Sequence, residues 1–255
     1  MRGDQRRAIP HVIHYCWFGN NEKSELEKKC IESWRKFCPN CQIIEWNESN
    51  YDITNCEYMK EAFEAKRWGF VADYARMDII YRYGGIYFDT DVELFRNIDE
   101  LFENECFFGF ERGLDTSETV FINSGQGFGA SAENEIVRKM RDVYQSLHFI
   151  NLDGSENLRT CPYYNTDVLV NEGMEQIDKR QIVSGAIVYP SEYFCPIDWR
   201  TKECRITDNT FSVHHFNASW LSENEKKIRA KDRKKDYIVH FPNRCLSRLL
   251  GKKKY

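Results

Sequence analysis

The residues best suited to chemistry in this chain are two aspartates that follow a short apolar run. Asp89 and Asp91 are separated by one threonine and come directly after residues 86–88. In an extended segment residues i and i+2 point the same way, so both carboxylates face one point. Two aspartates held that close repel each other unless a cation or a proton neutralises them. A hard divalent cation, which commonly also carries substrate phosphates, is the natural occupant.

A charged pair lies upstream, and the lengths of the helix and strand that follow it predict that the pair lies near the two aspartates. Asp73 and Arg76 are three residues apart in a segment with helical periodicity, which ends at Gly84-Gly85. A helix over residues 73–83 is roughly 15 Å long, and a strand over residues 86–89 returns by about 13 Å. The start of the helix and the end of the strand therefore lie at one edge. We predict that these two residues meet both aspartates there, beyond the carboxyl end of a strand, where α/β sheets bind ligands.

An Asp-x-Asp by itself is more often a solvated turn than a metal site, but eight positions at fixed spacing are more specific. The pattern Ala72-Asp73-x-x-Arg76, Gly84-Gly85-x-Tyr87-x-Asp89-x-Asp91 resembles the sugar-nucleotide site of glycosyltransferase family 32. This family includes capsular-polysaccharide transferases and yeast mannosyltransferases, and the large clostridial glucosylating toxins are distant relatives.

The resemblance implies an α/β fold of the GT-A type, with a mixed, mostly parallel central sheet flanked by helices. It also implies a nucleotide-sugar donor, Mn²⁺ or Mg²⁺ as cofactor, and retention of anomeric configuration. Asp89, Asp91 and Arg76 take the catalytic positions. Asp73, Arg76, Tyr87 and Asp89 lie on the donor. The two aspartates hold sugar or ribose hydroxyls, and Arg76 donates to charge that develops on the diphosphate.

Residues 9–18 read as the first strand and end at the turn signal Gly19-Asn20. Trp17 at this end is a core residue or a platform for a flat ring. The run resembles the opening motif of the family, whose tryptophan stacks on uracil or another base. No Gly-x-Gly-x-x-Gly follows, so a glycine-rich loop is not expected to hold phosphate, and the need for a metal increases.

The glycine-rich residues 121–130 form a strand and turn in which backbone can approach a ligand closely. Asn123 matches a family position near the donor sugar, and the alternative is a bulged strand. Cys161, in Thr160-Cys161-Pro162, stands where the family carries glycine. That difference puts the local backbone in question.

Two adjacent histidines, His214 and His215, follow a strand in residues 211–220. They are a salt-linked surface pair or metal ligands, since imidazole also suits manganese. The stretch resembles the C-terminal motif of the family, which implies His215 as a metal ligand and Trp220 as an indole N–H donor to phosphate. Ala218 replaces a metal-binding serine of the toxins, and Asn217 or Ser219 can substitute for it.

Charge divides the chain into two parts. The net charge of −4 does not suggest nucleic acid as a partner. Residues 221–255 contain twelve Lys and Arg against four Asp and Glu. We expect a transferase domain over residues 9–220 and a basic helical segment over residues 221–255. That segment lies on an anionic membrane surface or caps the domain as a solvated helix.

Ten scattered cysteines, without a second pair at zinc-ligand spacing, indicate reduced thiols. Neither a signal segment nor a long apolar run is evident. The expected location is therefore the cytoplasm, with peripheral contact at the inner face of the cell membrane.

The sequence thus predicts a metal-dependent glycosyltransferase that moves a sugar from a nucleotide-sugar, UDP-sugar first, to a glycan or lipid-linked saccharide acceptor in surface or capsular polysaccharide synthesis. Two alternatives stay open. A haloacid-dehalogenase-type phosphatase also carries Asp-x-Asp after an apolar strand, but it needs a threonine or valine where Glu93 stands and a later acidic pair. A non-catalytic sugar-nucleotide-binding module would bind donor without transfer or hydrolysis.

Overall fold

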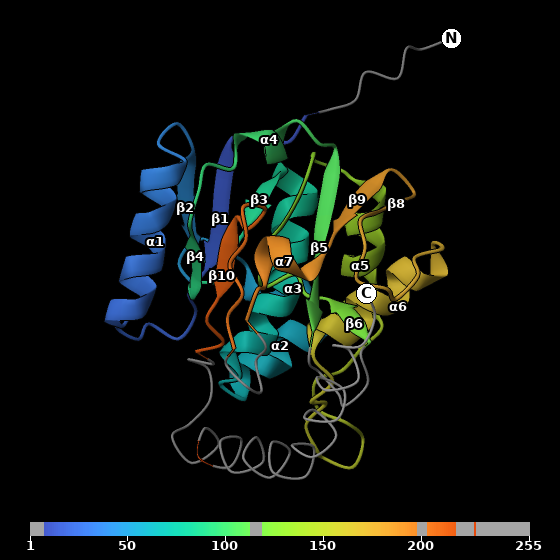
Figure 1. The fold of residues 1–255 in the computed structure, drawn as a ribbon. Coiled ribbons are helices and arrows are strands. Elements are labelled where there is room, and N and C mark those ends of the chain that lie inside the picture. The colour runs from blue at the N-terminus through green and yellow to red at the C-terminus, as the bar shows by residue number, and fades with distance from the viewer. Residues whose placement is uncertain (1–7, 113–118, 198–202, 218–226, 228–255) are drawn as a thin grey trace.

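A mixed eight-stranded sheet forms the centre of the protein in the computed structural model, which describes residues 8–112, 119–197, 203–217 and 227 (Figure 1). Its strand order is β2-β1-β3-β7-β5-β9-β8, with β6 paired to β5. The strands are β1 (Val12–Cys16), β2 (Gln42–Trp46), β3 (Gly85–Tyr87), β5 (Cys106–Arg112), β6 (Val120–Ile122), β7 (Phe128–Ala130), β8 (Gln181–Val183) and β9 (Ala186–Tyr189).

Most strands of this sheet run in one direction. β2, β1 and β3 pair in parallel, and so do β5 and β9. Because β7 is antiparallel to both β3 and β5, these two parallel groups share one direction. β6 and β8 run against their neighbours. The predicted mixed, mostly parallel sheet flanked by helices is confirmed.

Two apolar cores cover the two faces of the sheet. Helices α2 (Glu57–Glu64), α3 (Trp68–Tyr83), α5 (Glu135–Gln145) and α6 (Cys161–Asn171) contribute to one core. The other lies under α1 (Glu25–Phe37), α4 (Asp99–Phe102), α7 (Ser191–Phe194) and a separate antiparallel ribbon of β4 (Val92–Leu94) and β10 (Ser212–His214). A short 3-10 helix, η1 (Ile53–Asn55), precedes α2. In Figure 1 the ribbon and α7 lie in front of the sheet, and α3 lies behind it.

Helix α3 is the buried centre of the fold. Its residues from Phe70 to Ile80 are all buried, polar ones included. Gly84 ends it with φ 66°, a left-handed value that glycine adopts readily, as the sequence predicted. The helix begins at Trp68, before the predicted start at residue 73. Because the helix is buried on most sides, its apolar stripe marks only part of its length and does not reveal where it begins.

Three local expectations differ from the structure. The largely apolar residues 182–189 predict a single strand, but they form the hairpin β8–β9, because Ser184 and Gly185 both take positive φ and reverse the chain. The glycine-rich stretch is divided into β6 and β7 by a loop over residues 123–127. Cys38 and Cys41 form a disulfide rather than two free thiols.

Within the described ranges, no helix combines the length and apolar character needed to cross a bilayer.

Candidate functional site

Arg76 joins the first turns of α3 to the end of β3. Its Nη2 lies 3.1 Å from Oδ1 of Asp73 and 3.2 Å from Oδ1 of Asp89. Its Nε donates to the carbonyl oxygen of Ala72 at 3.1 Å. The guanidinium is buried, so both ion pairs are shielded from water. The structure therefore brings together three of the residues that helix and strand lengths placed at one edge.

Tyr87 supports this arrangement from inside the sheet. Its hydroxyl donates to Oδ1 of Asp89 at 2.9 Å, and the guanidinium carbon of Arg76 lies 5.0 Å from its ring centroid. The side chain is fully buried. In the structure its polar atom thus faces Asp89.

Asp73 is a buried acid with opposing influences on its ionisation. Burial raises the pKa of Asp73 to about 6, although the positive charge of Arg76 beside it lowers that pKa. Cys161 is a further neighbour, with Sγ 3.7 Å from Nη1 of Arg76 and 3.8 Å from Oγ of Ser124. Sequence reasoning did not place Ser124 or Cys161 in this site, although both belong to stretches that it had singled out.

The loop over residues 123–127 closes on the same carboxylate. The backbone N–H of Asp89 donates to the carbonyl oxygen of Gly125 at 2.8 Å. A Cβ on Gly125 would overlap Oδ2 of Asp89 and lie 3.0 Å from Nη1 of Arg76. Glycine is required here for close approach to protein groups of the site. The glycine-rich composition signalled such an approach, but not its partner.

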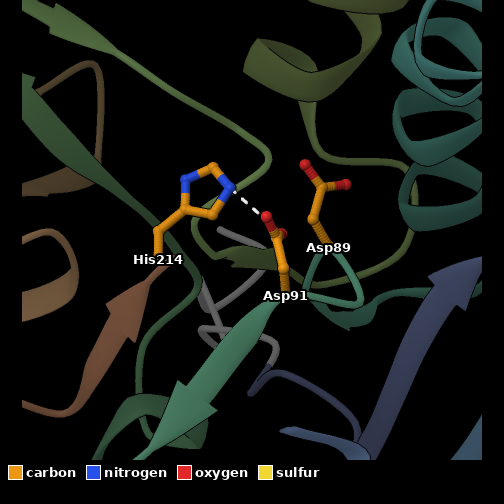
Figure 2. A group of neighbouring side chains, drawn as sticks. All are labelled: Asp89, Asp91 and His214. Carbon is orange, nitrogen blue, oxygen red and sulfur yellow. Dashed lines mark ion pairs between the residues drawn. The ribbon is translucent and has the colours of Figure 1, made fainter. Parts of the chain in front are cut away.

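Asp89, Asp91 and His214 form a group that fits one metal ion. Each offers one ligand atom, and these atoms all lie within 4.8 Å of one another. Figure 2 shows the ring of His214 and the carboxylate of Asp91 pointing toward each other, with Asp89 alongside. Nε2 of His214 lies 3.2 Å from Oδ1 of Asp91. Ligands on opposite sides of a magnesium-sized ion are about 4 Å apart, so this group needs little adjustment to share one.

The electrostatics of the Asp91–His214 pair favour the ionised carboxylate. Burial raises the pKa of Asp91, but His214 and the backbone N–H of Asn217, 2.7 Å from Oδ2, outweigh burial and leave that pKa lowered. Burial lowers the pKa of His214, but Asp91 outweighs it and leaves the pKa raised. The Nδ1 atom of His214 is buried without a hydrogen-bond partner in the described part of the chain.

The structure differs from the expectation at the histidine pair, because His214, not His215, lies in this group. Glu93 faces Val213 across the β4–β10 ribbon. Alternate residues share a face, so His215 lies on the face of Glu93, and its Nε2 is 2.9 Å from Oε2 of that residue. Glu93 also pairs with Lys29 at 2.8 Å. His215 thus takes part in the salt-linked cluster that was the alternative for this pair.

The other residues predicted to contact the nucleotide-sugar or the metal differ in where they lie. Trp17 is half-buried just beyond β1, which is hydrogen-bonded to β3, and its Nε1 donates to the carbonyl oxygen of Asn21 at 2.7 Å. Asn123 is buried and contacts Glu111 and Gly125. Trp220, together with Ala218 and Ser219, lies outside the described residues. Asn217 donates its side-chain amide to Oε1 of Glu27 at 2.7 Å.

Residues 24–108 match the family described as "Glycosyltransferase sugar-binding region containing DXD motif". The chain is 29% identical over 159 residues to inositol phosphoceramide mannosyltransferase 3 of Schizosaccharomyces pombe, over 57% of this chain and 41% of the relative. It thus spans less than half the length of that relative. It is 24% identical over 223 residues to an uncharacterized glycosyltransferase of Acanthamoeba polyphaga mimivirus, over 83% of this chain and 84% of the relative.

Among solved structures, the fold is similar to that of PaToxG glycosyltransferase, with a TM-score of 0.50 and 17% identity over 66% of this chain and 71% of the other. The matched residues 24–108 include α3, β3 and both aspartates of the Asp-x-Asp. Over these residues the chain is similar to the glycosyltransferase sugar-binding family with a DXD motif, which confirms the resemblance seen in its sequence.

Proposed function

We propose that this protein transfers a sugar from a nucleotide-sugar donor, UDP-sugar first, to a glycan or lipid-linked saccharide acceptor. The observation that carries the proposal is the group of Asp89, Asp91 and His214, whose ligand atoms lie within 4.8 Å of one another beyond the end of β3. These residues would hold Mn²⁺ or Mg²⁺. Such an ion, when bound, neutralises a diphosphate and makes it a better leaving group.

Arg76 has a supporting role in this proposal. Its Nη2 faces Asp73 and Asp89, and its Nη1 lies 3.5 Å from Oγ of Ser124. The resemblance implies that it donates directly to charge developing on the diphosphate. The contacts favour a second role, in which it fixes both carboxylates and adds buried positive charge beside them. Asp73 and Asp89 are then oriented to accept hydrogen bonds from sugar or ribose hydroxyls.

The remaining parts of the proposal concern the donor base, the acceptor and the stereochemistry. Trp17 serves as the base platform and Trp220 as a phosphate donor. The relative named as an inositol phosphoceramide mannosyltransferase supports a lipid-linked acceptor and a mannosyl donor as one of the choices to test. Front-face attack by the acceptor with retention is our hypothesis for the mechanism. An NMR time course showing product of inverted configuration would refute it.

The wider role is also a proposal. Surface or capsular polysaccharide synthesis supplies the class of acceptor that we expect. The division into a transferase domain over residues 9–220 and a basic segment over residues 221–255 provides a way to reach such acceptors at an anionic membrane surface.

The function is tested with a panel of nucleotide sugars, including UDP-glucose and GDP-mannose, whose hydrolysis is followed with Mn²⁺ or with EDTA. We expect one donor to be hydrolysed only with the metal. Asp91→Ala should reduce this turnover by about 100-fold or more. Glu93→Gln is the matched control, because this nearby acid pairs with Lys29 and His215 instead.

Two results would contradict the proposed function. One is unchanged turnover of Asp91→Ala with Mn²⁺. The other is metal-dependent release of phosphate from p-nitrophenyl phosphate without turnover of any nucleotide sugar, which would favour the phosphatase alternative.

A further inference from the structure

We propose that Glu111 is a positioning residue that holds Asp89 in place through Asn123 and Gly125. The proposal rests on the proposed function only in taking Asp89 as part of the metal and donor site. Nothing in the Asp-x-Asp pattern points to Glu111, which lies on a different strand.

Glu111 is a buried acid on the site side of the sheet. Along β5, Phe107, Gly109 and Glu111 share one face, and Phe107 packs in the core beneath the β4–β10 ribbon. Glu111 is 2% exposed. Burial raises the pKa of Glu111, and the hydrogen bond from Asn123 and the charge of His214 oppose this effect. A buried carboxylate is unfavourable unless its partners offset the loss of water, so its contacts indicate its role.

The amide of Asn123 is fixed in one orientation by its two partners. The backbone N–H of Gly125 can only donate, so the amide atom 2.7 Å away is Oδ1. The Nδ2 atom therefore faces Glu111 and donates to its Oε2. The orientation follows from donor and acceptor chemistry and does not depend on telling nitrogen from oxygen. Without an acceptor at Glu111, one end of this amide would be buried and unpaired.

Gly125 carries the constraint from Asn123 to Asp89. Its N–H is held by Asn123, and its carbonyl oxygen accepts the N–H of Asp89 at 2.8 Å. Its missing side chain leaves the space in which Oδ2 of Asp89 and Nη1 of Arg76 lie. A shift of Gly125 would therefore move the carboxylate that Tyr87 and Arg76 hold on its other oxygen. Each link is a backbone or buried contact, so the path is stiff.

Two substitutions separate the acceptor of Glu111 from its charge. Glu111→Gln keeps an acceptor oxygen at the same reach, whereas Glu111→Leu removes it at similar volume. Binding of Mn²⁺, followed by EPR of the free ion, is read beside nucleotide-sugar turnover. We expect Glu111→Leu to weaken Mn²⁺ binding and lower kcat by about 10-fold each, as supporting residues of metal sites do. Glu111→Gln should stay within about threefold of the parent in both measurements.

Matched variants control for general effects of altering a buried acid. Asp78 is a buried acid on α3 that pairs with Tyr51 and Arg82. Asp78→Asn should lower the unfolding temperature without changing Mn²⁺ affinity. Should Glu111→Leu fail to fold, the double variant Glu111→Leu/Asn123→Leu removes both ends of the Glu111–Asn123 hydrogen bond, so that only the N–H of Gly125 loses its acceptor. We expect the double variant to lose Mn²⁺ affinity by about 10-fold as well.

The proposal would be overturned if either folded leucine variant kept both its Mn²⁺ affinity and its turnover within about threefold of the parent protein. Equal losses in Glu111→Gln and Glu111→Leu would also overturn it, because charge rather than the acceptor would then be decisive. Mn²⁺ binding does not require turnover. A parent protein that binds Mn²⁺ but processes no donor would contradict the proposed function and leave this test intact.

Discussion

Nη2 of Arg76 lies 3.2 Å from Oδ1 of Asp89 and is shared with Asp73, so one buried nitrogen joins helix α3 to the end of β3. A planar guanidinium can serve several acceptors at fixed angles, whereas an ammonium is a single point charge. The arrangement therefore depends on arginine itself and not only on positive charge at this position.

Arg76→Lys should leave one carboxylate without its partner and lower metal-dependent donor turnover by about 10-fold or more. Steady-state kinetics with the donor identified in the panel measure this loss. Arg82→Lys is the control, because Arg82 is largely exposed and pairs with Asp78 away from the site. Equal kinetics for Arg76→Lys and the parent protein would show that charge alone suffices.

Gly125→Ala tests the close approach of the loop to Asp89. The new methyl group would overlap Oδ2 of Asp89, so the carboxylate or the loop must move. We expect a fall in turnover of about 10-fold or more and a lower unfolding temperature. Gly154→Ala serves as the control, because it meets nothing within 4 Å, although its φ of +82° strains alanine. It should lose some stability and keep its activity. An active Gly125→Ala would show that the loop yields without consequence.

His14 makes the stability of the fold depend on pH. Trp46 donates to its Nδ1 and its Nε2 donates to the carbonyl oxygen of Gly84, each at 3.0 Å, so the neutral ring is fully bonded. Burial lowers the pKa of His14 to about 4, and the Gly84 hydrogen bond opposes this in part. The unfolded chain, with a histidine pKa near 6.5, takes up a proton at a higher pH than the folded chain does.

This contribution is therefore complete above pH 6.5 and lost progressively as the pH falls to about 4. Between pH 7 and pH 5 the free energy of unfolding should fall by about 2 kcal/mol from this group. Urea unfolding at the two values measures the change, with His14→Gln as the comparison. The variant is less stable at pH 7 but should lack this part of the decrease. An equal decrease in both proteins would assign the pH dependence to other groups.

Local geometry explains which parts of the site the sequence could predict. The end of α3 at Gly84 and the meeting of Asp73, Arg76 and Asp89 follow from helix rise, strand rise and short spacings within one continuous segment. The hairpin within residues 182–189 was also signalled, since Ser184-Gly185 is a turn dipeptide.

Contacts between distant segments were beyond such reasoning. The choice between His214 and His215 depends on the register of β10 on β4, two three-residue strands with no periodic signal, and a shift of one residue exchanges their faces. Glu111 was missed because the apolar run over residues 106–110 predicts a strand that ends at Phe110, whereas β5 continues to Arg112 and buries the acid. A charged residue is usually exposed, and the residues around Glu111 in the sequence give no sign that it is buried.

The central claim, that Asp89, Asp91 and His214 bind a divalent cation, is tested most directly by the affinity for Mn²⁺ of His214→Ala and His215→Ala. The two adjacent imidazoles contact different acids, Asp91 and Glu93, so each variant is the control for the other. EPR titration of the free ion should show that His214→Ala binds Mn²⁺ about 10-fold more weakly or worse, whereas the affinity of His215→Ala stays close to that of the parent protein. Unchanged affinity in His214→Ala, with loss in His215→Ala, would contradict the claim.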